Sequence, residues 1–221
     1  MIKKLVIYGA GDIAQLAKYY FSSDSEYEVV AFCVDRSHFT QVEFMGLPVV
    51  VFEEVEVFYP STEYEMFVAF SYSKLNKVRE DRYFAAKDKG YELASYVSSR
   101  TSMLNQGKIG DNCFILEDNT VQPFVELGSN VTLWSGNHIG HHSKIKDHCF
   151  IASHVVISGG VEVGERCFIG VNATVRDHVT IGAMCVIGAG ALILSDAETL
   201  GVYVGTATER SKVPSNKLRK I

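Results

Sequence analysis

A six-residue repeat of aliphatic residues fills most of the second half of the chain and restricts its fold more than any other feature. From Ile109 to Ile193, every sixth residue is Ile, Val or Leu, which gives 15 positions without a break in register. The residue four places after each one is mostly small, as at Cys113, Asn119 and Ala173. A period of six fits neither an amphipathic helix nor an alternating strand. It is the period of a parallel β-helix, in which three hexads, and therefore 18 residues, close one triangular coil.

The repeat also predicts which side chains point inward. The aliphatic residue and the small residue four places later should fill the interior, while the residues two and three places later should lie at a corner. Cys33 lies in an apolar run of the first half. The other four cysteines occupy the small interior position of the repeat: Cys113, Cys149, Cys167, Cys185. We therefore interpret the cysteines as packing residues rather than as disulfides, metal ligands or nucleophiles.

The first half of the chain alternates strand and helix patterns, which predicts a small parallel α/β sheet. The complete fold prediction is an N-terminal α/β (half-Rossmann) domain followed by a parallel β-helix. The predicted domains are residues 1–98, residues 99–196, and a C-terminal strand and basic tail at 197–221. Strands are expected at residues 2–8, 28–34, 48–51, 66–70 and 91–97, and helices at 13–21 and 74–89.

A glycine-rich turn follows the first predicted strand. Gly9-x-Gly11-x-x-Ala14 matches the fingerprint with which a β–α turn approaches a diphosphate. Asp35 follows the second predicted strand, where an acidic residue usually meets a ribose or a base edge. About 95 residues hold only one mononucleotide-binding half, so we expect a single nucleotide, such as a nucleotide sugar, rather than NAD. The alternative is a tight turn that binds no ligand.

Five of the seven histidines fall between residues 138 and 154. The 18-residue coil places His141 above Pro123 and below Gly159, and His142 below Gly160. A pair of glycines beside these histidines should leave a notch in which a ligand reaches the imidazole of His141. Because a histidine side chain titrates near neutral pH, it is suited to act as a general base.

Other polar residues of the repeat have plainer interpretations. We expect His148 and His178 to be solvated corner residues. Asn119 and Asn137 lie at interior positions one coil apart, which predicts a stacked amide ladder. Asn137 is also expected near the groove of His141.

Composition excludes several classes of function. The net charge of −5 argues against a nucleic-acid partner. The apolar run at residues 5–8 is too short for a signal peptide or a membrane span, so we expect a cytoplasmic protein with no membrane insertion.

The glycine turn together with the hexads resembles the sugar acyltransferases of the sialic-acid-cluster type. Among them, the chain is most similar to N-acetyltransferases that act on nucleotide-linked amino sugars. The resemblance implies a left-handed β-helix, a homotrimer with active sites between neighbouring β-helices, and acetyl-CoA as co-substrate without a metal. It also implies a dTDP- or UDP-linked acceptor, typically a 4-amino-4,6-dideoxy sugar, in surface polysaccharide (O-antigen) or glycan synthesis.

The resemblance assigns roles to particular residues. The segment Ile139-Gly140-His141-His142-Ser143 corresponds to the family's catalytic segment, so that His141 is the general base. Relatives commonly carry an acidic residue where this chain has His142, which leaves the group that orients the base open. The candidates for this supporting role are His142, Asn137, Glu117 and Asp118.

The two substrates receive separate sets of residues. The nucleotide of the acceptor is expected at Gly9, Ala10, Gly11, Asp12, Asp35, Arg36, Ser71 and Tyr72. Acetyl-CoA is expected at Ala152, Gly159, Gly160, Val171, Gly188 and Ala189. The basic tail is either a further contact for the CoA phosphates or a solvated terminus: Arg210, Lys212, Lys217, Arg219, Lys220.

Four other functions are weighed against N-acetylation. O-acetylation of a sugar hydroxyl uses the same fold, and so does a non-catalytic trimeric scaffold that binds nucleotide sugars. Serine acetyltransferases share the hexads but carry a helical N-terminal domain, which the glycine turn disfavours. The histidine cluster resembles the zinc site of gamma-class carbonic anhydrases, but its spacing does not match that site.

Overall fold

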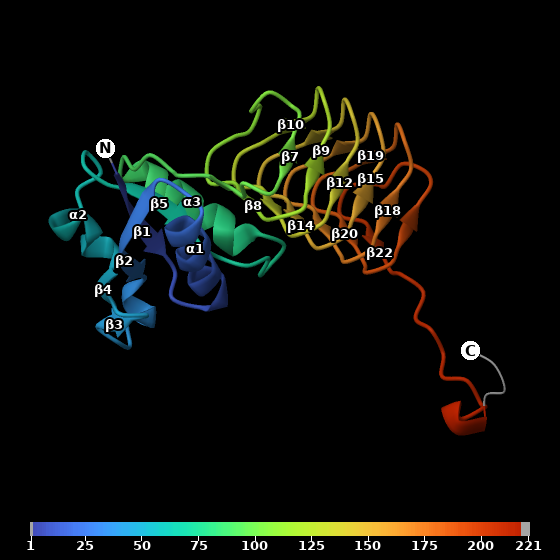
Figure 1. The fold of residues 1–221 in the computed structure, drawn as a ribbon, viewed down its shortest axis with the longest axis horizontal. Helices are drawn as coiled ribbons and strands as arrows, with labels where there is room; N and C mark the ends of the chain where they lie inside the picture. The colour runs from blue at the N-terminus through green and yellow to red at the C-terminus, as the bar shows by residue number, and fades with distance from the viewer. Residues whose placement is uncertain (1, 218–221) are drawn as a thin grey trace.

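The computed structural model describes residues 2–217 of the 221-residue chain. An α/β unit lies at one end of a long β-helix, and the C-terminal segment leaves the last coil of the β-helix (Figure 1). Within residues 2–217, no helix combines the length and apolar character needed to cross a bilayer.

The α/β unit is a five-stranded sheet in the order β3-β4-β2-β1-β5, with β4, β2, β1 and β5 parallel. The central strand β1 is buried on both faces, because Leu5 and Ile7 pack on the side of α1 and Val6 and Tyr8 on the side of α3. The helices and strands of the α/β unit are β1 (Lys3–Tyr8), α1 (Asp12–Ser23), β2 (Tyr27–Val34), β3 (Glu43–Phe44), β4 (Leu47–Val51), α2 (Val55–Phe58), β5 (Glu65–Val68) and α3 (Lys77–Asp88).

The sheet differs from the prediction in two places. Strand β3 pairs antiparallel with β4 through a two-residue turn at Met45 and Gly46, both with positive φ, so the sheet is mixed rather than wholly parallel. The predicted strand at residues 91–97 is wrong: Leu93 makes a single bridge to Met66, and only Tyr96–Val97 forms a strand. That strand, β6, pairs with β8 and therefore belongs to the β-helix.

The β-helix has three parallel sheets, which we name in chain order as the first, second and third face. The first face contains β6 (Tyr96–Val97), β8 (Phe114–Ile115), β11 (Thr132–Leu133), β14 (Phe150–Ile151), β17 (Phe168–Ile169), β20 (Val186–Ile187) and β22 (Val202–Tyr203). The second face contains β7 (Ser102–Met103), β9 (Thr120–Val121), β12 (His138–Ile139), β15 (Val156–Ile157), β18 (Thr174–Val175) and β21 (Leu192–Ile193). The third face contains β10 (Glu126–Leu127), β13 (Lys144–Ile145), β16 (Glu162–Val163) and β19 (Thr180–Ile181).

The interior columns agree with the sequence prediction. Every aliphatic hexad residue from Ile115 to Ile193 is at most 5% exposed, and the small residues between them are buried as well. Asn119 and Asn137 are buried, but they do not bond amide to amide. The Oδ1 of Asn119 accepts the main-chain N–H of Asn137 at 3.1 Å, and the Oδ1 of Asn137 accepts that of Val155 at 2.8 Å. These bonds offset the cost of burying polar groups.

We number the corners by the faces that they join: first to second, second to third, and third back to first. At each corner from residue 112 to residue 190, the third residue after the aliphatic position has a positive φ, from 51° at Asn112 to 78° at Gly136. Gly and Asn adopt this conformation most readily, and His is also enriched there. Four of the seven histidines hold this position, which explains much of the histidine-rich stretch as turn chemistry: His142, His148, His154, His178.

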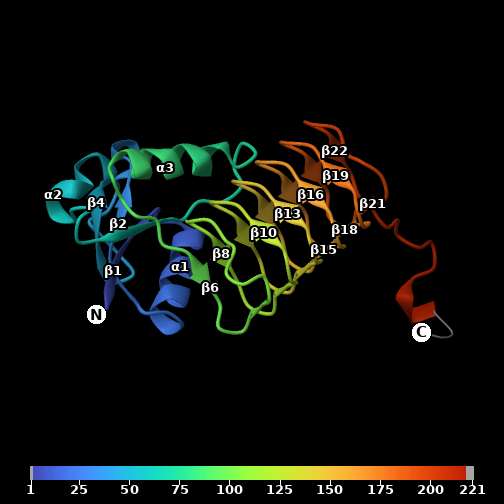
Figure 2. The ribbon, with the colours of Figure 1, turned by 90° about the horizontal axis from the view of Figure 1, so that it is seen from above.

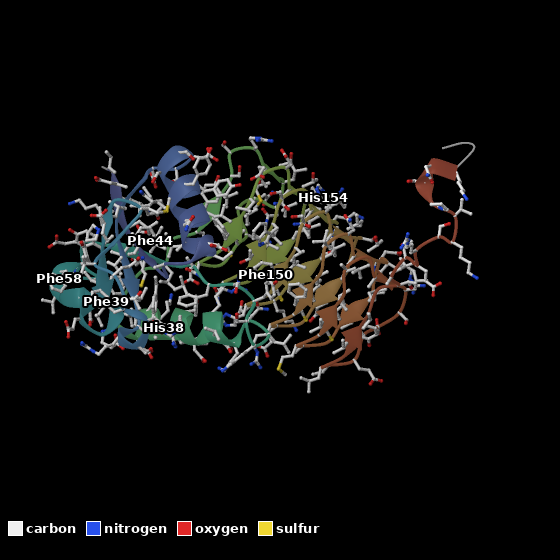
Figure 3. All side chains as sticks on the ribbon, turned by 90° about the horizontal axis from the view of Figure 1, so that it is seen from below. His38, Phe39, Phe44, Phe58, Phe150 and His154 are labelled. Carbon is white, nitrogen blue, oxygen red and sulfur yellow. The ribbon has the colours of Figure 1, made fainter. Side chains whose placement is uncertain are left out.

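Helix α3 lies along the first coils and joins the two units (Figure 2). It begins at Lys77 rather than at residue 74, because Lys74, Leu75 and Asn76 are left-handed. The aromatic ring of Phe150 lies where the two units meet (Figure 3), and the guanidinium carbon of Arg79 is 5.6 Å from its centre.

Candidate active site

The glycine turn between β1 and α1 leaves open space for a ligand. Gly9 has a φ of 130°, and a Cβ there would lie 2.8 Å from the carbonyl oxygen of Ala69, so only glycine fits. Gly11 has no such requirement, because no atom lies within 4 Å of the place where its Cβ would be. Gly11 is the N-cap of α1 and no side chain caps that end. The amide groups of the first turn therefore face an open space suited to an anionic group.

Two hollows flank this turn, and both include Gly9, Ala10 and Gly11. One measures about 500 Å³ and lies between the turn, Asp12, residues 69–72 and Trp134 of the β-helix. The other measures about 370 Å³ and extends past Asp35 and Arg82. Seven of the eight predicted acceptor residues line these hollows: Gly9, Ala10, Gly11, Asp12, Asp35, Ser71, Tyr72.

The eighth predicted residue, Arg36, lies outside both hollows and pairs with Glu54 on the surface. Asp35 lies at the hollow, but its carboxylate already accepts hydrogen bonds from the hydroxyl of Tyr8 and from Arg82, the latter at 2.6 and 2.9 Å. Burial and the Asp35 carboxylate raise the pKa of the Tyr8 phenol, which therefore stays protonated as a donor. Asp35 thus holds Arg82 at the wall of the smaller hollow.

The loop that lines both hollows, residues 69–76, is anchored to the β-helix at both ends. At one end, the side chain of Asn112 bonds the N–H and C=O of Val68 at 2.7 and 3.3 Å. At the other end, Asn76 is buried and its amide donates to the carbonyls of Arg166 and Cys167. Three consecutive left-handed residues cost about 1–2 kcal/mol each, which these anchors must offset.

Trp134 is a lining residue that the sequence reasoning missed. It is the only tryptophan in the chain, and it brings the β-helix to the larger hollow. Its indole nitrogen is buried and has no hydrogen-bond partner among residues 2–217. The sequence did contain a signal for Trp134. Ala152 and Gly170, which lie 18 and 36 residues later in the same column of the repeat, are both small.

The predicted base, His141, lies at the second corner with its imidazole exposed to solvent. Its Nδ1 is 3.0 Å from Nδ1 of His142, and its main-chain N–H donates to Oε1 of Gln122 at 2.8 Å. The ring of His142 in turn packs on Phe124, with 4.7 Å between ring centres. Gln122 and Phe124 are neighbours of the base that the sequence reasoning did not select.

Two imidazoles lie against the Gly159–Gly160 pair, that of His141 beside Gly159 and that of His178 beside Gly160. A Cβ on Gly159 would lie 2.6 Å from Cε1 and 2.8 Å from Nε2 of His141. A Cβ on Gly160 would lie 2.5 Å from Nδ1 of His178. The glycine pair therefore leaves room for two imidazoles, and His141 lies beside Gly159 as the coil spacing predicts, but the ring beside Gly160 belongs to His178 and not to His142.

The other supporting candidates lie at the first corner and have partners of their own. Glu117 accepts hydrogen bonds from Tyr20 at 2.8 Å and from Ser135 at 2.7 Å, and Asp118 pairs with Arg100 at 2.9 Å. Within residues 2–217, the side chain of Asn137 bonds only main-chain groups, those of Trp134 and Val155. Of the four candidates, His142 is the one that touches His141.

The residues predicted to bind acetyl-CoA fall into two groups. Gly159 and Gly160 lie beside His141 at the second corner, whereas the other four lie at the first corner, across the second face: Ala152, Val171, Gly188, Ala189. In the predicted basic tail, Arg210, Lys212 and Lys217 are exposed, whereas Arg219 and Lys220 lie outside the described residues.

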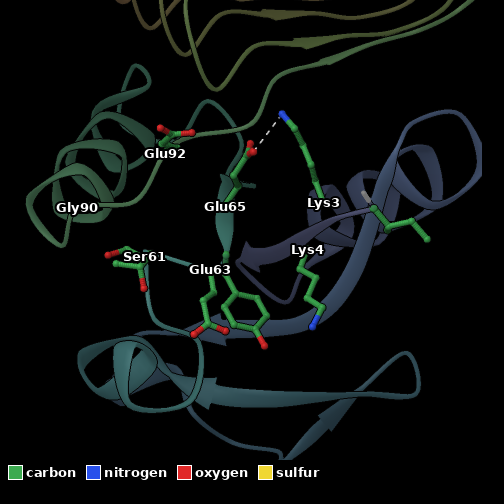
Figure 4. Close-up of a pocket in the computed structure, with 10 residues that line it drawn as sticks. Lys3, Lys4, Ser61, Glu63, Glu65, Gly90 and Glu92 are labelled. Carbon is green, nitrogen blue, oxygen red and sulfur yellow. Dashed lines mark ion pairs between the residues drawn. The ribbon is translucent and has the colours of Figure 1, made fainter.

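A third hollow, of about 540 Å³, lies at the amino ends of β1 and β5 (Figure 4). Among its charged groups, Lys3 pairs with Glu65 at 3.2 Å. Parallel sheets bind ligands at the opposite, carboxyl ends of their strands, where the glycine turn lies. Within residues 2–217, no group of three or more His, Cys, Asp or Glu side chains is arranged to hold a metal ion.

Comparison with known proteins identifies the fold. Residues 107–141, 127–159 and 160–195 match the bacterial transferase hexapeptide (six repeats) family. No curated protein matches the chain. A variant of perosamine N-acetyltransferase from Caulobacter crescentus, solved with CoA and GDP-perosamine, has a TM-score of 0.83 at 23% identity, over 93% of this chain and 95% of that one.

Two further solved structures share the architecture. The acetyltransferase domain of PglB from Neisseria gonorrhoeae FA1090, in complex with acetyl coenzyme A, has a TM-score of 0.79 at 24% identity, over 90% of this chain and 94% of that one. WeeI from Acinetobacter baumannii AYE has a TM-score of 0.77 at 17% identity, over 92% and 97%.

These matches define the fold of the protein. The repeat matches the hexapeptide family over residues 107–195, and the fold of the chain is a small α/β unit followed by a left-handed parallel β-helix, as the resemblance implied. More particularly, it shares this two-part architecture over nearly its whole length with the perosamine and PglB enzymes.

Proposed function

We propose that the protein is an N-acetyltransferase that moves the acetyl group of acetyl-CoA to the amine of a nucleotide-linked amino sugar. The amine nitrogen attacks the thioester carbonyl, a C–N bond forms and the C–S bond breaks. The nitrogen loses one proton to the base, and the departing CoA thiolate takes up one proton. Direct transfer of this kind needs no covalent enzyme intermediate.

The observation that carries this proposal is the position of the His141 imidazole, which is exposed beside Gly159 while its Nδ1 bonds His142. One of the two Nδ1 atoms must donate to the other. When His141 is the donor, its Nε2 holds a free lone pair that can accept the proton of the amine. His142 then orients the base in place of the acidic residue that relatives commonly carry.

The acceptor nucleotide is proposed to cross the glycine turn. Its diphosphate lies at Gly9–Gly11, its nucleoside in the hollow beside Asp35, and its sugar in the hollow that Trp134 closes. Two hollows that share the turn fit a ligand with two bulky ends joined by a diphosphate. The favoured sugar is a 4-amino-4,6-dideoxy hexose, and binding of the remote nucleotide contributes to orienting its amine.

A homotrimer would bring the two halves of the donor site together. The outward strand residues of the second face are uncharged or histidine, as at Thr120, His138 and Val156, whereas outward strand residues of the third face form ion pairs such as Lys144 with Glu126. Packing three second faces around a threefold axis sets the second corner of one subunit beside the first corner of the next. His141 and Gly159 would then face Ala152 and Val171 of a neighbouring subunit, with acetyl-CoA between them.

Turnover with a panel of acceptors tests this function. Release of CoA from acetyl-CoA is measured with GDP-, UDP- and dTDP-linked amino sugars, and acetylation of nitrogen is verified by mass spectrometry. The single tryptophan gives an independent binding signal, because its fluorescence should change when the larger hollow fills. His141→Asn should keep the trimer and both binding signals while losing most of kcat. Near wild-type kcat/KM in that variant would refute the role of His141.

The competing functions have distinct outcomes in the same panel. Acetylation of a hydroxyl with no reaction of any amine would favour an O-acetyltransferase. Binding of nucleotide sugars without any turnover would favour a trimeric scaffold. Since acetyl-CoA and nucleotide sugars are made in the cytoplasm, we place the enzyme there, in surface polysaccharide or glycan synthesis.

A further inference from the structure

The third corner carries a buried column of polar residues. Asn112, Asn130 and His148 follow each other at intervals of 18 residues, all with left-handed backbone, and none is more than 4% exposed. A corner of a β-helix normally faces water, and the sequence reasoning placed His148 there as a solvated residue. That expectation is wrong, because α3 and β5 cover this corner.

The column forms a chain of hydrogen bonds whose direction is fixed from the main chain outward. The N–H of Val68 donates to Oδ1 of Asn112 at 2.7 Å, so the Nδ2 of Asn112 is the donor to Oδ1 of Asn130 at 2.8 Å. The Nδ2 of Asn130 then faces Nδ1 of His148 at 2.9 Å. Because an amide nitrogen only donates, Nδ1 of His148 must accept and its proton must lie on Nε2.

We propose that His148, acting through Asn130 and Asn112, is a positioning residue for the loop that holds the acceptor nucleotide. The chain of bonds ends on Val68, and the next four residues, 69–72, line the larger hollow. Ala69 also contacts Gly9, so a shift of Val68 would reach the glycine turn itself. This inference rests on the proposed function only in naming the nucleotide as the ligand.

The surroundings keep His148 in the neutral form that the chain of bonds requires. Glu80 of α3 faces its Nε2 at 3.9 Å, and Asp147 and Glu165 add negative charge nearby. The rings of Tyr83 and Phe84 pack edge-on to the imidazole, and Arg79 bonds the main-chain carbonyl of His148. Burial outweighs the acidic neighbours and lowers the pKa of His148. Protonation of Nδ1 would set two donors against each other and break the chain at Asn130.

Two substitutions separate positioning from simple packing. In His148→Asn, Oδ1 replaces Nδ1 at the same distance from Cβ, so the acceptor remains but cannot be protonated. In His148→Leu the acceptor is lost. Leucine is also unfavourable in the left-handed backbone conformation of residue 148. The variant His154→Leu measures that cost in unfolding free energy, because His154 holds the equivalent position at the first corner. Unfolding free energies of all three variants verify that they fold.

The first measurement is amide hydrogen exchange of residues 66–73, which needs no ligand. His148→Leu should speed exchange there about tenfold, the effect of one lost buried hydrogen bond, while His148→Asn matches the wild type. Equal protection in all variants would overturn the inference.

The second measurement is the dissociation constant of GDP-mannose, UDP-N-acetylglucosamine and dTDP-glucose, whose diphosphates do not titrate between pH 5 and 8. For whichever probe binds, His148→Leu should weaken binding about tenfold with CoA binding unchanged. The wild type should lose affinity from pH 7.5 to 5.5, and His148→Asn should not. Unchanged affinity in His148→Leu would refute the link to the acceptor. No binding of any probe to the wild type would count against the proposed function, and exchange would still decide whether the loop is positioned.

Discussion

Gly159→Ala tests whether the missing side chain at residue 159 is needed to seat the base. The new Cβ would lie 2.6 Å from Cε1 of His141. Carbon atoms in contact are normally about 3.5–4.0 Å apart, so the imidazole must move by about 1 Å. A displacement of that size costs about 100-fold in rate when the reacting groups are otherwise in place.

The same substitution should leave the fold intact. Gly159 does not have a positive φ, so alanine adopts its backbone without strain. The atoms that must yield belong to the end of an exposed side chain, and the loss of glycine's freedom in the unfolded chain adds up to about 1 kcal/mol of stability. We therefore expect kcat to fall about 100-fold while the melting temperature is unchanged or slightly higher.

Steady-state kinetics in two backgrounds provide the assay. If Gly159→Ala acts through His141, it should lower kcat in the wild type and have no further effect in His141→Asn. Gly160→Ala is the contrasting variant, because its φ of 67° and the nearby His178 predict a loss of stability instead. A kcat for Gly159→Ala within twofold of wild type, or an equal loss in the His141→Asn background, would refute the reasoning.

Three further predictions concern stability and reactivity. Arg79→Ala should lower the unfolding free energy in urea by about 3 kcal/mol, since it leaves a cavity and removes the hydrogen bonds to the carbonyls of His148 and Cys149; a change under 1 kcal/mol would contradict this. Burial lowers the pKa of His148 below 6.5, so the unfolded chain takes up this proton at a higher pH than the folded protein does. The free energy of unfolding should therefore fall as the pH drops below about 6.5, by at most about 1.4 kcal/mol per pH unit. Urea unfolding at pH 7.5, 6.5 and 5.5 should show this slope reduced in His148→Asn. Burial raises the pKa of Cys113 to about 12, and all five thiols are buried, so the native protein should react with a disulfide reagent only after denaturation.

The β-helix was predictable because its rules are local. Each coil repeats the same inward columns, so the residues from Ile109 to Ile193 determine the register without knowledge of any distant contact. The glycine turn was also readable, since Gly9 and Gly11 adjoin the strand and the helix that they connect. Predictions at this level required only the spacing of residues along the chain.

The parts that failed depend on contacts between distant segments. His148 looks like any other corner residue until α3 covers it, and Arg79 looks like an ordinary charged helix residue although it is 2% exposed. The segment 91–97 has the composition of a strand, but Tyr96 and Val97 pair with the first coil instead of with the sheet. Trp134 faces the larger hollow only because the α/β unit packs there.

The length of α3 has a limit set by the coils beneath it. The side chains of its N-cap residue Asn76 and of its residues Arg79 and Lys87 reach four successive coils, at residues 166–167, 148–149, 132 and 111. Helical turns repeat about every 5.4 Å and stacked strands about every 4.8 Å, so each further coil adds about 0.6 Å of mismatch. Three steps give about 1.8 Å, which long side chains absorb, whereas a fourth would approach half the coil spacing. A longer α3 would therefore lose its partners, and the coils beyond residue 167 must be stabilised by their own stacking or by a neighbouring subunit.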